Sequence, residues 1–201
     1  MRKIVASEYI SLDGIVESGW TGRSPALSPA DELTSGYFNS AEVGQEVGAL
    51  SAQGDTLLLG RVTYQGFAAF FAGQSGDTAN FMNAMPKVVV SSTLKKADWQ
   101  NTTIVGAYPV REIAALKQQP GRNINVSGSA MLVRWLLRER LLDELHLLVF
   151  PVVMGGGTRL FSEGTQPADL GPAACASLGN GVLHLTYQPS TRWPESAGRP
   201  A

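Results

Sequence analysis

The stretch LLLGRVTYQGF, residues 57–67, joins a buried strand to a polar turn and the start of a helix. Its three leucines form a short apolar run, which is typical of a strand covered on both faces. Gly60, Arg61 and Thr63 follow directly: glycine lets another group approach the backbone, arginine offers a planar set of donors, and threonine adds a hydroxyl. The stretch therefore predicts an anion-binding turn at the carboxyl end of a strand in an α/β sheet.

The same alternation of strands and helices continues on both sides of this stretch. Apolar runs predict strands over residues 3–10, 54–60, 87–92, 102–105, 123–128 and 143–153, and an alternating pattern predicts an antiparallel strand over 181–189. Helical patterns cover residues 43–50, 61–71, 110–118 and 129–140. We therefore expect an α/β fold with a mostly parallel central sheet, an antiparallel C-terminal strand and helices on both faces.

The domain organisation is expected to be simple. Residues 1–189 are predicted to form one domain, whereas residues 190–201 lack hydrophobic periodicity and are predicted to be a flexible tail. Residues 15–38 are rich in glycine, serine and proline, so we expect a long loop that acts as a flap over the site.

Composition and charge argue against several classes of partner. The 201 residues include 16 Lys and Arg against 17 Asp and Glu, so no basic surplus indicates binding to nucleic acid or to an anionic membrane. The N-terminus does not resemble a signal peptide, and no run of about 18 apolar residues occurs, so we expect a cytoplasmic protein. The single cysteine, Cys175, cannot form an internal disulfide and is expected to be a small packing residue.

Two further strands end in residues that suit phosphate groups. Ser91 and Ser92 end the predicted strand 87–92, and Ser127, Gly128 and Ser129 form a small-residue turn before a helix. Each turn alone is more often structural than ligand-binding. Three such turns at the carboxyl ends of one parallel sheet predict a polyanion site, although the chain has neither G-x-G-x-x-G after its first strand nor a P-loop motif.

The order of these motifs resembles the dihydrofolate-reductase-like superfamily, and especially the stand-alone relatives of the riboflavin-biosynthesis (RibD) C-terminal reductase domain. The resemblance covers roughly residues 2–188 and rests mainly on LLLGRVTY and LLDELHLLVFPVVMGGG. It implies that the three turns hold the phosphates of NADPH. The cofactor-binding residues that it implies, with Ser127 of the same turn, are Gly60, Arg61, Thr63, Ser91, Ser92, Gly128, Ser129, Ala130 and Met131.

The resemblance also implies a reaction, namely hydride transfer from NADPH to a small heterocyclic substrate such as a pterin or a ribosylaminopyrimidine. Phe67 and Val126 stand where riboflavin-pathway reductases tend to have acidic residues, so the resemblance defines the cofactor better than the substrate. A true dihydrofolate reductase and a non-catalytic NADP(H)-binding module remain alternatives. A homodimer is also implied. The apolar stretch LHLLVFPVV, residues 145–153, would suit it but can equally lie inside one subunit.

Asp13 and Asp31 are the candidate catalytic residues. Asp31 lies in SPADEL, where the resemblance places an acidic residue on the helix after the flap, and Asp13 follows the first strand at the carboxyl edge. An Asp-Gly pair is equally consistent with a simple turn. No metal site is predicted, because His146 and His184 lie far apart in the sequence and neither has the spacing of metal ligands; both are expected to be structural.

Overall fold

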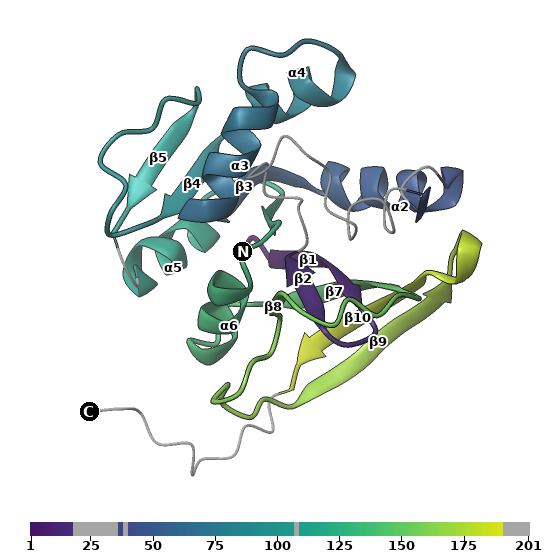
Figure 1. Ribbon diagram of the computed structural model, residues 1–201. Coiled ribbons are helices and arrows are strands. Elements are labelled where there is room, and N and C mark those ends of the chain that lie inside the picture. Colours follow the sequence, from purple (N-terminus) through teal and green to yellow (C-terminus); the bar gives the residue numbers. More distant parts are fainter. Residues whose placement is uncertain (18–35, 38–39, 107–108, 191–201) are drawn as a thin grey trace.

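The computed structural model describes residues 1–17, 36–37, 40–106 and 109–190 (Figure 1). Its centre is an eight-stranded sheet in the order β5-β4-β3-β6-β1-β7-β10-β9. The strands are β1 (Ile4–Ser11), β3 (Gly54–Gly60), β4 (Lys87–Val90), β5 (Thr102–Val105), β6 (Asn123–Val126), β7 (Glu144–Phe150), β9 (Leu170–Ser177) and β10 (Leu183–Pro189). The strands from β5 to β7 are parallel, and β10 runs antiparallel to both β7 and β9. This arrangement confirms the predicted mostly parallel sheet with an antiparallel C-terminal strand.

Helices cover both faces of the sheet, as predicted. The helices are α2 (Ala41–Ala52), α3 (Arg61–Phe71), α4 (Asp77–Ala84), α5 (Val110–Gln118) and α6 (Ala130–Arg138). Apolar side chains of α5 and α6 pack with the sheet in one core cluster. Helices α2, α3 and α4 contribute to two clusters on the opposite face. A short 3-10 helix, η1 (Gly179–Gly181), precedes β10.

The leucine run of β3 shows why this strand carries no polar alternation. Leu58 packs into the cluster under α5 and α6, whereas Leu57 and Leu59 pack into the cluster under α3. All three side chains are buried. Because successive side chains point to opposite faces and both faces are covered, all three positions of the leucine run are apolar.

Some elements were not predicted. Helix α4 and the edge strand β9 are additional, and a small second sheet pairs β2 (Ile15–Glu17) with β8 (Thr158–Arg159). The packing role expected for Cys175 is wrong, because this residue is exposed on β9. Strand β7 lies between β1 and β10, so its apolar sequence is explained within one chain and gives no support to the predicted homodimer.

Parts of the predicted flap and tail cannot be compared with the structure. Only the first residues of the flap, in β2, and Gly36 and Tyr37 near its end fall within the described ranges, and residues 18–35 and 191–201 lie outside them. None of the helices in the described ranges is long and apolar enough to cross a membrane.

Candidate functional site

A cavity of about 260 Å³ lies at the carboxyl edge of the sheet, where the turns after β3, β4 and β6 meet. These turns are neighbours because β3 pairs in parallel with both β4 and β6. The residues that line the cavity are Gly60, Arg61, Val62, Val90, Ser91, Ser92, Thr93, Ser129, Met131, Leu132 and Trp135. The three polar turns singled out in the sequence therefore contribute to one cavity.

Close contact between two turns explains why glycine occupies positions 60 and 128. A Cβ atom at Gly60 would lie 2.6 Å from Ser129 Oγ, and one at Gly128 would lie 3.0 Å from Thr63 Oγ1. Gly128 also has a φ of 79°, a backbone conformation that side chains other than glycine rarely adopt. The turns after β3 and β6 can approach each other only because both glycines lack a side chain.

Two helix N-termini contribute to the same cavity. Helix α3 begins at Arg61 and α6 at Ala130, and neither N-cap residue makes a side-chain capping hydrogen bond. The first N–H groups of both helices, with the positive ends of their dipoles, are therefore suited to an anion in the cavity. The guanidinium of Arg61 donates one hydrogen bond to Gln65 Oε1 at 2.9 Å. Its other N–H groups can donate hydrogen bonds to an anion.

The hydroxyl of Ser91 is fixed at the cavity wall by the backbone that follows it. Ser91 Oγ accepts hydrogen bonds from the N–H of Thr93 at 3.2 Å and the N–H of Leu94 at 2.9 Å. Its own hydrogen can then be donated to a ligand. Ser92 is exposed beside it.

The other sequence-predicted cofactor residues lie around this cavity rather than on its surface. Thr63 is buried against Gly128, and Ala130 is buried at the start of α6. Ser127 lines a different, smaller cavity of about 60 Å³. Residues 127–129 therefore separate the two cavities, with Ser127 on one side and Ser129 on the other.

The smaller cavity, which we call the β1–β6 cavity, lies between the sheet and α2. Ser7 and Tyr9 of β1 and Asn125 of β6 line it together with Ser127. Asn125 Nδ2 donates to the carbonyl of Ser51 at 2.9 Å, which joins β6 to the last turn of α2. Burial raises the pKa of Tyr9 to about 12, so its hydroxyl stays protonated at neutral pH. These polar groups in interior strands, which could not be located from the sequence, can hydrogen-bond a small polar group of a ligand.

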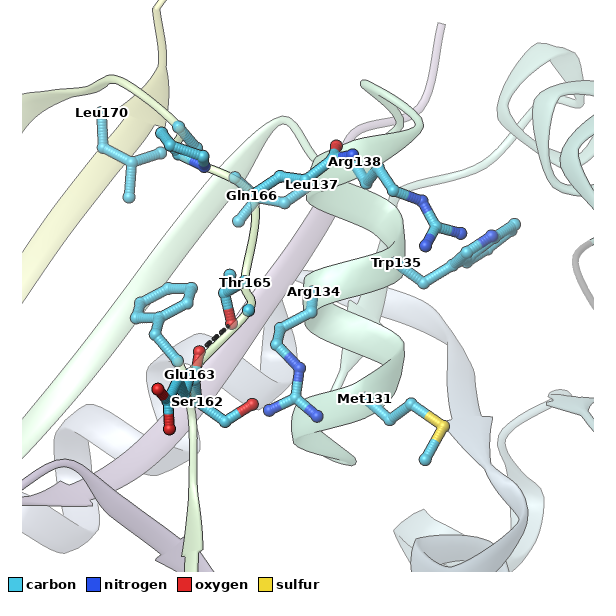
Figure 2. A pocket seen from close by; sticks show the side chains of 14 residues that line it. Met131, Arg134, Trp135, Leu137, Arg138, Ser162, Glu163, Thr165, Gln166 and Leu170 are labelled. Atoms are coloured by element: carbon cyan, nitrogen blue, oxygen red, sulfur yellow. Dashed lines mark hydrogen bonds between the residues drawn. The ribbon is translucent and has the colours of Figure 1, made fainter. Parts of the chain in front are cut away.

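A further cavity of about 630 Å³ lies beside α6 and the segment 161–170 (Figure 2). It shares Met131 and Trp135 with the cavity at the carboxyl edge, so these two residues mark the boundary between them. Arg134 Nη1 donates to the carbonyls of Arg159 and Leu160, each at 3.0 Å, and so fixes α6 to the end of β8. Met131, with 70% of its surface exposed, is the one predicted cofactor residue that borders both cavities.

Asp13 ties together the turns that follow β1 and β7. Its carboxylate accepts hydrogen bonds from Ser11 Oγ at 2.6 Å, the N–H of Met154 at 3.0 Å and the N–H of Gly155 at 2.9 Å. These hydrogen bonds, above all the one from Ser11, lower the pKa of Asp13 to about 2. An ionised carboxylate held in this way suits the turn-forming role better than proton donation. The catalytic role of Asp13 stays a prediction. Asp31 lies outside the described residues.

Glu8 supports the glycine turn and was also missed. It is buried on β1, and its Oε1 accepts a hydrogen bond from the N–H of Gly128 at 3.0 Å. A signal was present in the sequence, because Glu8 shares a strand face with Ala6 and Ile10, where an apolar residue is expected. A buried charge at such a position indicates a specific hydrogen-bonding task.

The two histidines, far apart in the sequence, are brought together on β7 and β10. His146 Nδ1 lies 2.8 Å from His184 Nε2. Within the described ranges, no three His, Cys, Asp or Glu side chains are arranged to hold a metal ion.

Comparisons with known proteins agree with this architecture. The family model for the RibD C-terminal domain matches residues 2–184. The uncharacterized protein YwjB of Bacillus subtilis (strain 168) is 30% identical over 185 residues, which cover 91% of this chain and 97% of YwjB.

Two solved structures share the fold. A putative riboflavin biosynthesis protein from Shewanella sp. PV-4 superimposes with a TM-score of 0.69 at 21% identity, covering 94% of this chain and 99% of that protein. Dihydrofolate reductase from Enterococcus faecalis, solved with NADP(H), superimposes with a TM-score of 0.57 at 14% identity, covering 93% and 96%. The predicted dihydrofolate-reductase-like fold is thereby confirmed.

Proposed function

The chain belongs to the RibD C-terminal domain family, and from this premise we propose that it is an NADPH-dependent reductase of a small heterocycle, of the pyrimidine or pterin class. The observation that carries the proposal is the meeting of three polar turns at one cavity on the carboxyl edge of the sheet. NADPH presents a pyrophosphate and a 2′-phosphate, and a chain with a net charge of −1 can bind such a polyanion only through a local site of this kind.

The residues of the cavity fit the cofactor. We assign the 2′-phosphate to Arg61 with Ser91 and Ser92, because a guanidinium and hydroxyls provide charge-assisted and neutral donors on one wall. We assign the pyrophosphate to the turn at Gly128 and Ser129, where the backbone is exposed by the absence of side chains and the N-terminus of α6 begins.

The contribution of the chain to the reaction is to bind, orient and exclude water. When bound, NADPH supplies the hydride. We place the polar edge of the heterocycle at the β1–β6 cavity, towards Tyr9 and Asn125, since this cavity and the cofactor cavity both border the turn at residues 127–129. Holding both partners against one turn converts their encounter into a reaction within a single complex. Asp13 keeps the neighbouring turn after β1 in place.

The test is NADPH oxidation with ribosylaminopyrimidine, dihydropterin and dihydrofolate substrates, using wild type, Arg61→Ala and Arg122→Ala. Arg122 is the matched control because its exposed guanidinium lies at the amino edge of the sheet, where it donates to the carbonyl of Ala52. Losing a charge-assisted hydrogen bond should raise the KM for NADPH by tenfold or more in Arg61→Ala, with little change in Arg122→Ala.

Two results would contradict the proposal. Equal KM values in Arg61→Ala and wild type would remove the assigned cofactor site. Tight NADPH binding without oxidation by any substrate would favour the alternative, a nucleotide-binding module without catalysis.

A further inference from the structure

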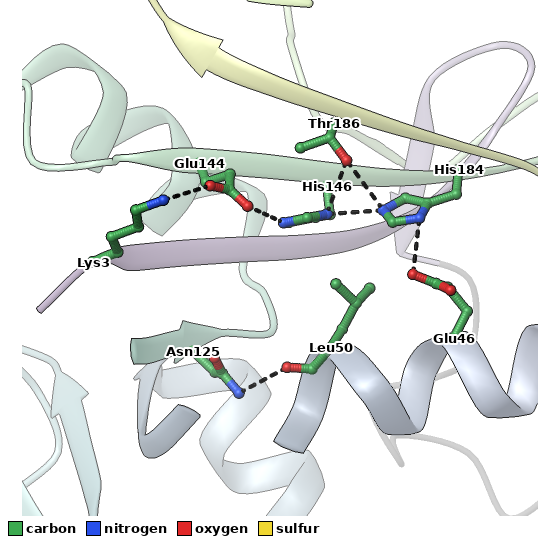
Figure 3. A network of polar contacts seen from close by, with 8 residues as sticks. All are labelled: Lys3, Glu46, Leu50, Asn125, Glu144, His146, His184 and Thr186. Carbon is green, nitrogen blue, oxygen red and sulfur yellow. Dashed lines mark hydrogen bonds and ion pairs between the residues drawn. The ribbon is translucent and has the colours of Figure 1, made fainter. Parts of the chain in front are cut away.

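A chain of hydrogen bonds and ion pairs runs from Lys3, directly before β1, to α2 through two buried histidines (Figure 3). His146 Nδ1 and His184 Nε2 lie 2.8 Å apart. Each outer ring nitrogen faces a carboxylate: His146 Nε2 lies 2.8 Å from Glu144 Oε1, and His184 Nδ1 lies 3.0 Å from Glu46 Oε1. The two histidine residues are only 5% and 9% exposed, so water cannot readily replace these partners.

The number of protons on this pair follows from the geometry. An ionised carboxylate only accepts hydrogen bonds, so each outer nitrogen must carry a hydrogen, and a neutral imidazole has only one N–H. If both rings were neutral, the two inner nitrogens would face each other with lone pairs at 2.8 Å. If both rings were cations, two N–H groups and two positive charges would face each other. One additional proton, held between the inner nitrogens, removes both conflicts.

The surrounding charges also balance for one shared proton. Two carboxylates face the pair, Glu144 of β7 and Glu46 of α2, and Lys3, which directly precedes β1, faces Glu144. Lys3 Nζ lies 3.2 Å from Glu144 Oε2. When the histidine pair carries one additional proton, its positive charge and that of Lys3 balance the negative charges of Glu144 and Glu46. Burial opposes ionisation of Glu144, but hydrogen bonds from Lys3 and His146 outweigh it and lower the pKa of Glu144.

The remaining neighbours do not change this count. Thr186 Oγ1 of β10 lies 3.3 Å from His146 Nδ1, and its single hydrogen could satisfy only one of two lone pairs. Tyr9, further along β1, stays neutral, since burial raises its pKa to about 12. Glu42, one turn before Glu46 on α2, lies beside Gly179 instead.

We propose that His146 and His184 share one proton and that the shared charge, through Glu46, holds α2 against the sheet. The consequence concerns the β1–β6 cavity, because α2 supplies one wall of it through Val47, Leu50 and Ser51. The two histidines are therefore positioning residues for whatever occupies that cavity. This last step, and only this step, rests on the proposed reductase function.

The pair should bind a second proton only with difficulty. Burial and the neighbouring charge of His146 lower the pKa of His184, and they outweigh the opposing effect of Glu46. Two strongly coupled rings lose their protons in two separate steps that belong to the pair rather than to either ring. Uptake of a second additional proton should therefore require a more acidic pH than an isolated histidine needs.

The shared proton can be observed directly, because the chain has only two histidines. Protein labelled with ¹⁵N-histidine gives ring-nitrogen signals from this pair alone. We expect a scalar coupling across the N–H···N hydrogen bond, with three ring nitrogens protonated on average at neutral pH. The coupling should disappear in His184→Asn. Two rings that titrate independently near the usual pKa of about 6.5, without a coupling, would overturn the proposal.

The positioning of α2 has its own readout in amide hydrogen exchange. Glu46→Gln keeps a hydrogen-bond acceptor but removes the charge that favours the shared proton, so residues 41–52 should exchange faster. Glu42→Gln is the matched control, one turn away on the same helix, and should exchange like wild type. Unchanged exchange of α2 in Glu46→Gln would contradict the positioning role.

NADPH affinity distinguishes this inference from the proposed function. Glu46 lies away from the three cofactor turns, so Glu46→Gln should bind NADPH as wild type does. If wild type binds NADPH but shows no shared proton between its histidines, the inference alone would be removed. Absence of NADPH binding in wild type would remove the proposed function alone.

Discussion

Substitution of Gly60 by alanine tests whether the turns after β3 and β6 really depend on mutual close contact. Gly60 has a φ of −74° and a ψ of 157°, values that alanine adopts without strain. The effect of Gly60→Ala must therefore come from its new Cβ atom, which would lie 2.6 Å from Ser129 Oγ. Non-bonded heavy atoms prefer to be about 3.5 Å apart or more, so one of the two groups must move.

The size of the effect follows from the atoms involved. Overpacking a tight site costs about 1–3 kcal/mol, and the lower part of that range applies because the serine hydroxyl can rotate. Replacing glycine by alanine also lowers the conformational entropy of the unfolded chain, which stabilises the folded protein by about 0.4–1 kcal/mol. Gly60→Ala alone should therefore lose only about 1 kcal/mol of stability, and a more decisive quantity is its coupling to Ser129.

The sign of the effect of Ser129→Gly should reverse between the two backgrounds. In the wild type this change should cost a few tenths of a kcal/mol, because Ser129 makes no side-chain capping hydrogen bond. In Gly60→Ala it should instead stabilise by about 1 kcal/mol, since it removes the clashing hydroxyl. Urea unfolding of the four proteins measures both steps as a double-mutant cycle. If the two changes are simply additive, the close contact between the turns does not exist.

Further predictions concern buried or strongly hydrogen-bonded charges. Glu8→Ala should destabilise the protein by about 1–3 kcal/mol and weaken NADPH binding, because it leaves the N–H of Gly128 without its acceptor. Glu8→Gln keeps an acceptor, so unfolding and binding assays should show most of the wild-type stability and NADPH affinity. Burial lowers the pKa of Lys87 from 10.5 to about 8 in the folded protein. Between these two pH values the unfolded chain binds more protons than the folded protein, so the free energy of unfolding should rise with pH. Unfolding measured against pH should lack that rise in Lys87→Met. The pKa of Asp13 is lowered to about 2, so its contribution should be complete above pH 3.8 and be lost towards pH 2; a stability difference between wild type and Asp13→Asn that persists at pH 2 would contradict this.

Features determined by local sequence were predictable. The turns at Gly60, Ser91 and Ser129 were located correctly, because each follows an apolar run and is followed by a turn or a helix start. In a parallel sheet all such turns lie at one edge, so their meeting at one cavity follows from the alternation of strands and helices.

Features determined by long-range pairing were not predictable. The register of β7 with β10 sets Thr186 opposite His146 and brings His184 beside it, and nothing near either histidine indicates this pairing. Strand β9 contains Gly171 and Pro172, which are weak strand formers, and it is stabilised by its pairing with β10 rather than by its own composition. The role of Asp13 likewise depends on the N–H groups of residues 154–155, which are distant in sequence.

Equilibrium binding of NADPH and NADH to the wild-type protein tests the cofactor assignment most directly, because the two cofactors differ only in the 2′-phosphate. Arg61, Ser91 and Ser92 line the wall assigned to that phosphate. A charge-assisted contact contributes roughly 1.5–3 kcal/mol, so NADPH should bind at least tenfold more tightly than NADH. Equal affinity for the two cofactors would contradict the assignment of this cavity to NADPH.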